Sequence, residues 1–257
     1  MSITLSKLMI NSPLDQFEII SLLGFNAPLF GYLHIAITNL ALYSIIVLII
    51  VLGINYMGNN DSKLLPSKWS IFLESIFASI NSIVREQIGK EIYLPFIYSL
   101  FIFILFANLI GIIPYSFTIT SSAIVSIGIS FTIFISVTIL GLVLHNIKFF
   151  SYFIPNGTPL GLVPLLVIIE LISYISRAGS LGIRLFANMC AGHILLKILS
   201  SFLFATFSGG PLFFIIALIP FPIFIGIIGL ELAICLIQAY VFTLLTCSYI
   251  KDALDLH

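Results

Sequence analysis

Long apolar runs separated by short polar intervals dominate the hydropathy pattern of this chain of 257 residues. A run over 33–56 contains no Asp, Glu, Lys or Arg and is long enough to cross a hydrocarbon core of about 30 Å. The interval 93–144 also lacks charge, and the polar run SFTITSS over 116–122 interrupts it. We therefore expect one span over 33–56 and two more over 93–113 and 121–144.

A charged interval lies between the first two of these spans. From Trp69 to Ile88 its apolar residues recur at i, i+3, i+4 and i+7, while Lys68, Glu74 and Arg85 fall on the other face. This spacing predicts an amphipathic helix over 66–92 that lies in the membrane interface instead of crossing it. A lipid surface and a partner subunit suit its apolar face equally well.

The last hundred residues form two apolar runs, over 160–207 and 211–250, with Gly209 and Gly210 between them. Each run would be at least about 60 Å long as a helix, which is twice the thickness of the bilayer core. Each run therefore either folds back into two short spans or forms one long, strongly tilted helix. Pro220 and Pro222 favour a kink in the second run.

These elements predict an all-α polytopic membrane protein with a single membrane domain over 1–257. The basic residues of the loops then give its orientation. If the first span runs from outside to inside, one lysine falls outside and six basic residues fall inside: Lys7 against Lys63, Lys68, Arg85, Lys90, Lys148 and Lys251. The positive-inside rule therefore favours an external N-terminus and an internal C-terminus, with five or seven spans.

Composition supports a membrane protein and excludes several other classes. The chain is 60% hydrophobic and only 8% charged, with a mean hydropathy of +1.24, whereas soluble domains carry roughly 25% charged residues. Its net charge of zero gives no support for a nucleic-acid partner. The three cysteines and four histidines are scattered, so we expect no metal and no cofactor. Residues 1–10 match an import signal poorly, which favours a bacterial protein or one made inside an organelle.

Charged residues inside the two long runs are the main clue to function. Arg184 is the most informative, because a charge at the centre of a membrane helix costs about 2.5–3.5 kcal/mol on insertion scales. Arginine cannot avoid that cost by releasing its proton. The other charged residues in these runs are Glu170, Arg177, Lys197 and Glu231.

Helical spacing groups these residues with nearby amides. Glu170, Arg177 and Arg184 are seven apart, about two turns, so they form one stripe, which Asn188 extends. His193, nine residues from Arg184, points the other way.

An antiparallel pairing of the two runs predicts which polar residues meet across the turn. If the two helices fold back symmetrically about Gly209, Arg184 lies level with position 234, between Glu231 and Gln238. Glu170 then lies close to Asp252. A path of polar residues reaching Arg184 from both sides favours ion conduction. Simpler roles remain open: Glu231 as the ion-pair partner of Arg184, amides as interhelical hydrogen bonds, and His193 as a structural residue. Arg177 and Lys197 suit snorkelling or lipid head groups.

Four segments resemble subunit a of the F-type ATP synthase. They are SLGIRLFANMCAGH (180–193), FANLIGIIPYSF (106–117), GLELAICLIQAYVFTLLTCSYIKDA (229–253) and SPLDQFE (12–18), the last resembling fungal mitochondrial members. The resemblance covers essentially the whole chain. It implies that 1–11 is a candidate cleaved leader with Ser12 as the mature N-terminus. It also implies that each of the last two runs is a single long tilted helix wrapped against a ring of c subunits.

The resemblance also implies a mechanism and partners. Protons would enter from the intermembrane space near His193, Asn188 and Glu231, with Gln238 at the centre, and would leave to the matrix near Glu170 and Asp252. Arg184 would stand between the two half-channels. The implied partners are the c ring, subunit b, small membrane subunits such as subunit 8, and lipid. The implied location is the mitochondrial inner membrane. A secondary transporter that holds an anion on Arg184 and a purely structural subunit are the alternatives.

Overall fold

Five apolar helices form most of the computed structural model, which describes residues 14–27, 33–58, 66–113, 116–153 and 160–254. Each is long and apolar enough to cross a membrane. They are α2 (Asn39–Gly58), α4 (Leu94–Ile112), α5 (Ala123–His145), α6 (Val163–Ser208) and α8 (Pro220–Leu254). The predicted class, an all-α polytopic membrane protein, is confirmed. The candidate leader over 1–11 lies outside the described residues.

A short β-hairpin precedes the first span and was not predicted. After the 3₁₀ turn η1 (Asp15–Phe17), strand β1 (Ser21–Ala27) pairs antiparallel with β2 (Leu33–Thr38). The predicted start of the span at 33 is therefore wrong, and the helix begins at Asn39. The cause is local: the Thr38 hydroxyl accepts the N–H of Ala41 at 3.4 Å, as a helix cap does.

The amphipathic helix is α3 (Lys68–Gln87), shorter at both ends than the predicted 66–92. Ser67 caps it by accepting the N–H of Ser70 at 3.2 Å, and Gly89, with φ +72°, turns the chain away after its end. Its buried residues Ile80 and Val84 belong to the core shared with α4 and α8. One side of α3 is thus already covered by this chain. The turn η3 (Glu91–Tyr93) leads into α4.

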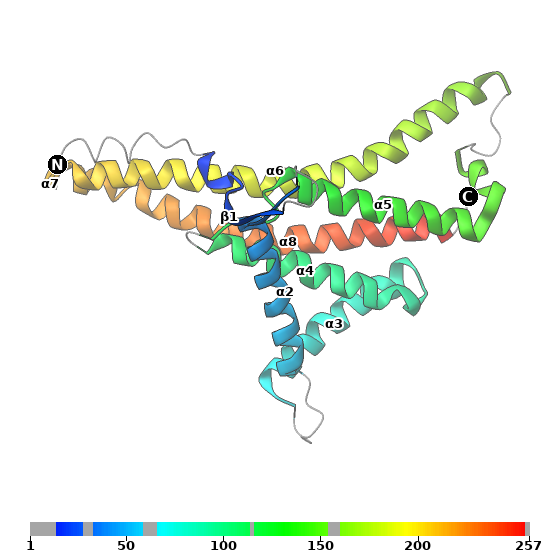
Figure 1. Ribbon diagram of the computed structural model, residues 1–257, viewed down its shortest axis with the longest axis horizontal. Helices are drawn as coiled ribbons and strands as arrows, with labels where there is room; N and C mark the ends of the chain where they lie inside the picture. Colours follow the sequence, from blue (N-terminus) through cyan, green and yellow to red (C-terminus); the bar gives the residue numbers. More distant parts are fainter. Residues whose placement is uncertain (1–13, 28–32, 59–65, 114–115, 154–159, 255–257) are drawn as a thin grey trace.

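The two long runs differ in continuity. Helix α6 is unbroken over 46 residues, about 69 Å at 1.5 Å per residue. The second run is not one helix: α7 (Pro211–Ala217) ends before Leu218, and α8 starts at Pro220. Pro220 and Pro222 have no N–H to donate to the preceding turn, which accounts for the break. In Figure 1, α6 and α8 run along the long axis of the molecule, and α2 crosses that direction.

Helices α4 and α5 pack against the α6–α8 pair. Helix α5 contacts both α6 and α8, and α4 contacts α8. Buried residues from each meet in one core, such as Ile104 of α4, Ile133 of α5, Leu185 of α6 and Phe242 of α8. The turns η4 (Asn146–Phe153) and η5 (Leu160–Leu162) connect α5 to α6. Packing in this core determines which faces of α6 and α8 contact each other and which faces point outward.

Candidate functional site

Arg184 lies on the outward face of α6. The face toward the core includes Leu181, Gly182 and Leu185, and a Cβ added at Gly182 would lie 2.9 Å from the Cα of Ile127 on α5. Two residues correspond to about 200° around a helix, so Arg184 points nearly opposite to Gly182. It is exposed, and among the described residues no carboxylate forms an ion pair with it. The close packing of α5 on Gly182 therefore presents a fixed cation on the surface of the helix pair.

Of the polar contacts that join α6 to α8, the one nearest the α6–α7 turn is between His193 and Glu231, which we call the outer pair. His193 Nδ1 lies 3.4 Å from Glu231 Oε1, and the Glu231 side chain is only 3% exposed. Gly192 makes room for that carboxylate, because a Cβ added there would lie 2.9 Å from Oε1. The ring of Phe17, from the N-terminal turn, lies edge-on to His193 with centroids 6.4 Å apart. Glu231 therefore contacts His193, and not Arg184 as one sequence interpretation had it.

The next residues toward the centre are two amides, the middle pair. Asn188 donates from Nδ2 to Oε1 of Gln238 at 3.0 Å, joining α6 to α8. A third amide lies nearby on α4: the Asn108 side chain is fully buried, and its backbone carbonyl faces the Cys235 thiol at 4.0 Å. Asn108 was not chosen as a site residue from the sequence. The signal available was a single amide in an otherwise apolar run.

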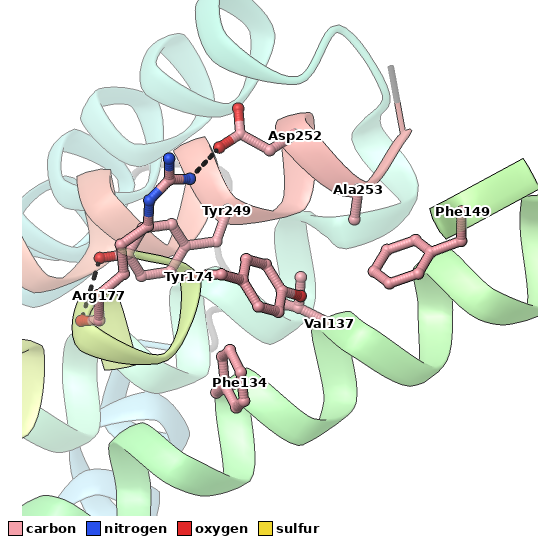
Figure 2. Close-up of a pocket in the computed structure, with 8 residues that line it drawn as sticks. All are labelled: Phe134, Val137, Phe149, Tyr174, Arg177, Tyr249, Asp252 and Ala253. Atoms are coloured by element: carbon pink, nitrogen blue, oxygen red, sulfur yellow. Dashed lines mark hydrogen bonds and ion pairs between the residues drawn. The ribbon is translucent and has the colours of Figure 1, made fainter. Parts of the chain in front are cut away.

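The third group, which we call the inner cluster, lies toward the C-terminal end of α8. Nη1 of Arg177 is 2.9 Å from Oδ2 of Asp252, and its Nη2 is 3.8 Å from Oε1 of Glu170. Figure 2 shows the Arg177 side chain extended toward Asp252 across the gap between α6 and α8. The sequence grouped Glu170 with Asp252 but did not identify the arginine that joins them.

The register of α6 against α8 differs from the predicted symmetry about Gly209. The pairing of Asn188 with Gln238 is symmetric about position 213 instead. The shift arises because α7 and the break before Pro220 lengthen the turn. As a result, Arg184 does not sit level with Glu231 and Gln238 but between the middle pair and the inner cluster. The outer pair, the middle pair and the inner cluster therefore follow one another along the helix pair. Arg184, which forms no ion pair with any described residue, lies between the middle pair and the inner cluster.

Several buried polar atoms at the outer pair, the middle pair and Asn108 have no hydrogen-bond partner among the described residues. They are His193 Nε2, both carboxylate oxygens of Glu231, Gln238 Nε2 and the two side-chain amide atoms of Asn108. Buried polar groups are normally hydrogen-bonded to protein or water, and leaving one unsatisfied costs about 1–3 kcal/mol. Six of these atoms therefore lie between α4, α6 and α8, where they are free to accept or donate further hydrogen bonds.

Comparisons with known proteins agree over almost the whole chain. A family model described as ATP synthase A chain matches residues 41–251. ATP synthase subunit a of Mycosarcoma maydis is 59% identical over 251 residues, which cover 97% of this chain and 99% of that protein. The protein of the same description from Emericella nidulans is 54% identical, covering 96% and 97%. That from Kluyveromyces lactis is 47% identical, covering 98% and 99%.

Proposed function

This chain belongs to the ATP synthase subunit a family, the membrane-sector subunit of that complex, and we propose that it forms the proton path of the motor. In this proposal it provides two offset half-channels that open to opposite sides of the membrane. A carboxylate on each c subunit collects a proton from one and releases it to the other. Proton flow thereby turns the ring and drives ATP synthesis.

The outer and middle pairs form the entry half-channel in this proposal. Its support is the row of buried polar atoms that have no hydrogen-bond partner in the described part of the chain, from His193 and Glu231 to Gln238 and Asn108. Water that satisfies these atoms would connect the outer surface with the level of Asn188. His193 and Glu231 can each bind and release a proton, and their 3.4 Å contact lets the proton pass between them.

Arg184 separates the two half-channels in this proposal. An ionised carboxylate is costly in lipid, and a fixed cation offsets that cost as the carboxylate of the ring passes. Because a guanidinium keeps its proton, it cannot relay protons from one half-channel to the other. The exposure of Arg184 opposite Gly182, with no ion-pair partner among the described residues, supports this role.

The exit half-channel would run past the inner cluster. Glu170 and Asp252 are about one-third exposed, as expected for carboxylates at a wetted mouth. They lie on the opposite side of Arg184 from the outer pair, along the same two helices. A proton released by the ring would pass to these carboxylates and then to water.

The partners and location follow from the same proposal. The c ring would lie against the outward face of α6 and α8 around Arg184. Helices of about 69 and 52 Å would lie strongly tilted against it, since each greatly exceeds the bilayer core. Subunit b, small membrane subunits such as subunit 8, and lipid would cover the remaining apolar surface, including Trp69 and Phe72 of α3. The location would be the mitochondrial inner membrane of a fungus, with the N-terminus in the intermembrane space and the C-terminus in the matrix.

The observation that carries the proposal is one arginine, without an ion-pair partner among the described residues, between two groups of proton-binding side chains. It is tested by ATP-driven proton pumping of the complete complex carrying Arg184→Ala, with assembly quantified separately. We expect pumping to fall at least about tenfold per assembled complex. This corresponds to an increase of about 1.4 kcal/mol in the activation free energy. Lys197→Gln removes another cation from α6 and serves as the control. Normal pumping by an assembled Arg184→Ala complex would contradict the proposal.

A further inference from the structure

Arg177 has a position that the proposed half-channels do not explain. Its guanidinium reaches one carboxylate on its own helix, Glu170 at 3.8 Å, and one on α8, Asp252 at 2.9 Å. A snorkelling arginine would turn its charge away toward water or head groups. Here the side chain instead turns across to the neighbouring helix, and its exposed fraction of 35% is close to that of each carboxylate.

Arg177 is joined to α8 through its backbone as well, and apolar residues lie beside it. The hydroxyl of Tyr249 donates to the backbone carbonyl of Arg177 at 3.4 Å, a second link between α6 and α8 at this position. Figure 2 shows aromatic side chains, among them Phe134 and Tyr174, on the side away from the Asp252 carboxylate. A cavity of about 20 Å³ between these residues has room for about one water molecule. The guanidinium therefore lies at the boundary between an apolar wall and the wetted mouth.

The net charge of the inner cluster indicates the role of Arg177. With both carboxylates ionised, Glu170 and Asp252 bring two negative charges to the mouth, and Arg177 cancels one of them. The inner cluster then carries a net charge of −1, and the arrival of one proton brings it to zero. Without the cation the two carboxylates would repel each other, which favours binding of a proton and disfavours its release.

We propose that Arg177 is a positioning residue of the exit half-channel, which sets both the geometry and the net charge of the Glu170–Asp252 pair. The inference rests on the proposed function. One proton at a time passes from the c-ring carboxyl to a carboxylate of the cluster and then to water. Arg177 itself neither gains nor loses a proton in this sequence. It aligns the Asp252 carboxylate by a direct ion pair and keeps the cluster able to accept and release a single proton.

The test compares Arg177→Gln with two double variants in the complete complex. Arg177→Gln changes the net charge of the cluster to −2, whereas Arg177→Gln/Glu170→Gln and Arg177→Gln/Asp252→Asn return it to −1. We expect Arg177→Gln to lower ATP-driven pumping about tenfold per assembled complex, and at least one double variant to recover to within about twofold of the parent. A purely structural role predicts no such recovery, because each double variant removes more contacts than the single one.

Two controls keep the outcome decisive. Arg85→Gln breaks an ion pair of 2.7 Å between largely exposed side chains, which should leave pumping unchanged. If Arg177→Gln does not assemble, the comparison is made between Arg177→Lys, which keeps the charge and should retain most pumping, and the same double variants. Normal pumping by Arg177→Gln, or double variants no better than Arg177→Gln, would overturn the inference. Loss of pumping by Arg184→Ala alongside either result leaves the proposed function standing.

Discussion

Glycines control where the charged side chains of this protein lie. Gly182 allows α5 to approach α6 and so turns Arg184 outward, and Gly192 leaves space for the carboxylate of Glu231. In each case the functional atom belongs to one residue and the space it needs is provided by another. Substitutions at these glycines therefore separate effects on the site from effects on the fold.

Gly192→Ala should reduce proton pumping without reducing assembly. The added Cβ would lie 2.9 Å from Glu231 Oε1, the end of a flexible side chain, so the carboxylate moves and the helices do not. We expect a loss of up to about tenfold in ATP-driven pumping per assembled complex. A Cβ added at Gly179 on the same helix meets no atom of the described residues within 4 Å, so Gly179→Ala is the matched control. Equal pumping by the two variants would refute the role assigned to the Glu231 position.

The middle pair should behave as one unit. Because Asn188 donates to Gln238 at 3.0 Å, the effects of Asn188→Ala and Gln238→Ala should not add. Interhelical hydrogen bonds in membranes average about 0.6 kcal/mol and reach about 1.7, so the coupling in a double-mutant cycle of complex stability should fall in that range. Additive effects within error would show that the two amides act separately.

For single residues, the sequence predicts which side chains belong to the site better than it predicts which of them contact each other. Charged and amide side chains in apolar runs were recognised because burying them is costly. Their pairing across the turn depends on register, and the break before Pro220 moved the register by several residues. Arg177 was therefore grouped with the correct helix face, but its contact with Asp252 on α8 was not identified.

The helices themselves follow from hydropathy, with errors only where a different local structure competes. The apolar run 33–56 includes strand β2 at its start, because a run of Leu, Ile, Ala and Thr has the hydropathy of a span but pairs equally well as a strand. The choice between one long helix and two short ones could not be made from length alone. For α6 the structure shows one long helix, in which a continuous face from Ala178 to Met189 packs on the neighbouring helices.

Gly182→Ala should affect the packing of α5 against α6 instead of the proton-binding side chains. A Cβ there would clash with the Ser130 side chain and lie 3.0 Å from the backbone oxygen of Ser126, so α5 and α6 must separate. Overpacking of this kind costs about 1–3 kcal/mol. We expect less assembled complex on native gels. At Gly128 on α5 an added Cβ has no neighbour within 4 Å in the described part of the chain, so Gly128→Ala should assemble normally. Full assembly of Gly182→Ala would show that the contact is not tight.

The whole molecule has an odd number of candidate spans, five among the described residues, so its two ends should lie on opposite sides of the membrane. Together with the positive-inside pattern, this predicts an N-terminus in the intermembrane space and a C-terminus in the matrix. Single cysteines introduced near each end can be labelled by a membrane-impermeant maleimide in mitochondria and in inverted inner-membrane vesicles. Labelling of both ends from the same side would contradict five spans.

The central claim is that Arg184 keeps two half-channels apart, so that protons cross only when the ring turns. It is tested most directly by proton flux through complexes in liposomes whose c ring is cross-linked to the stator, under an imposed membrane potential. The account predicts no flux in the parent complex with the ring locked, and a measurable leak in Arg184→Ala under the same conditions. Flux through the locked parent complex, or a locked Arg184→Ala complex as tight as the parent, would contradict it.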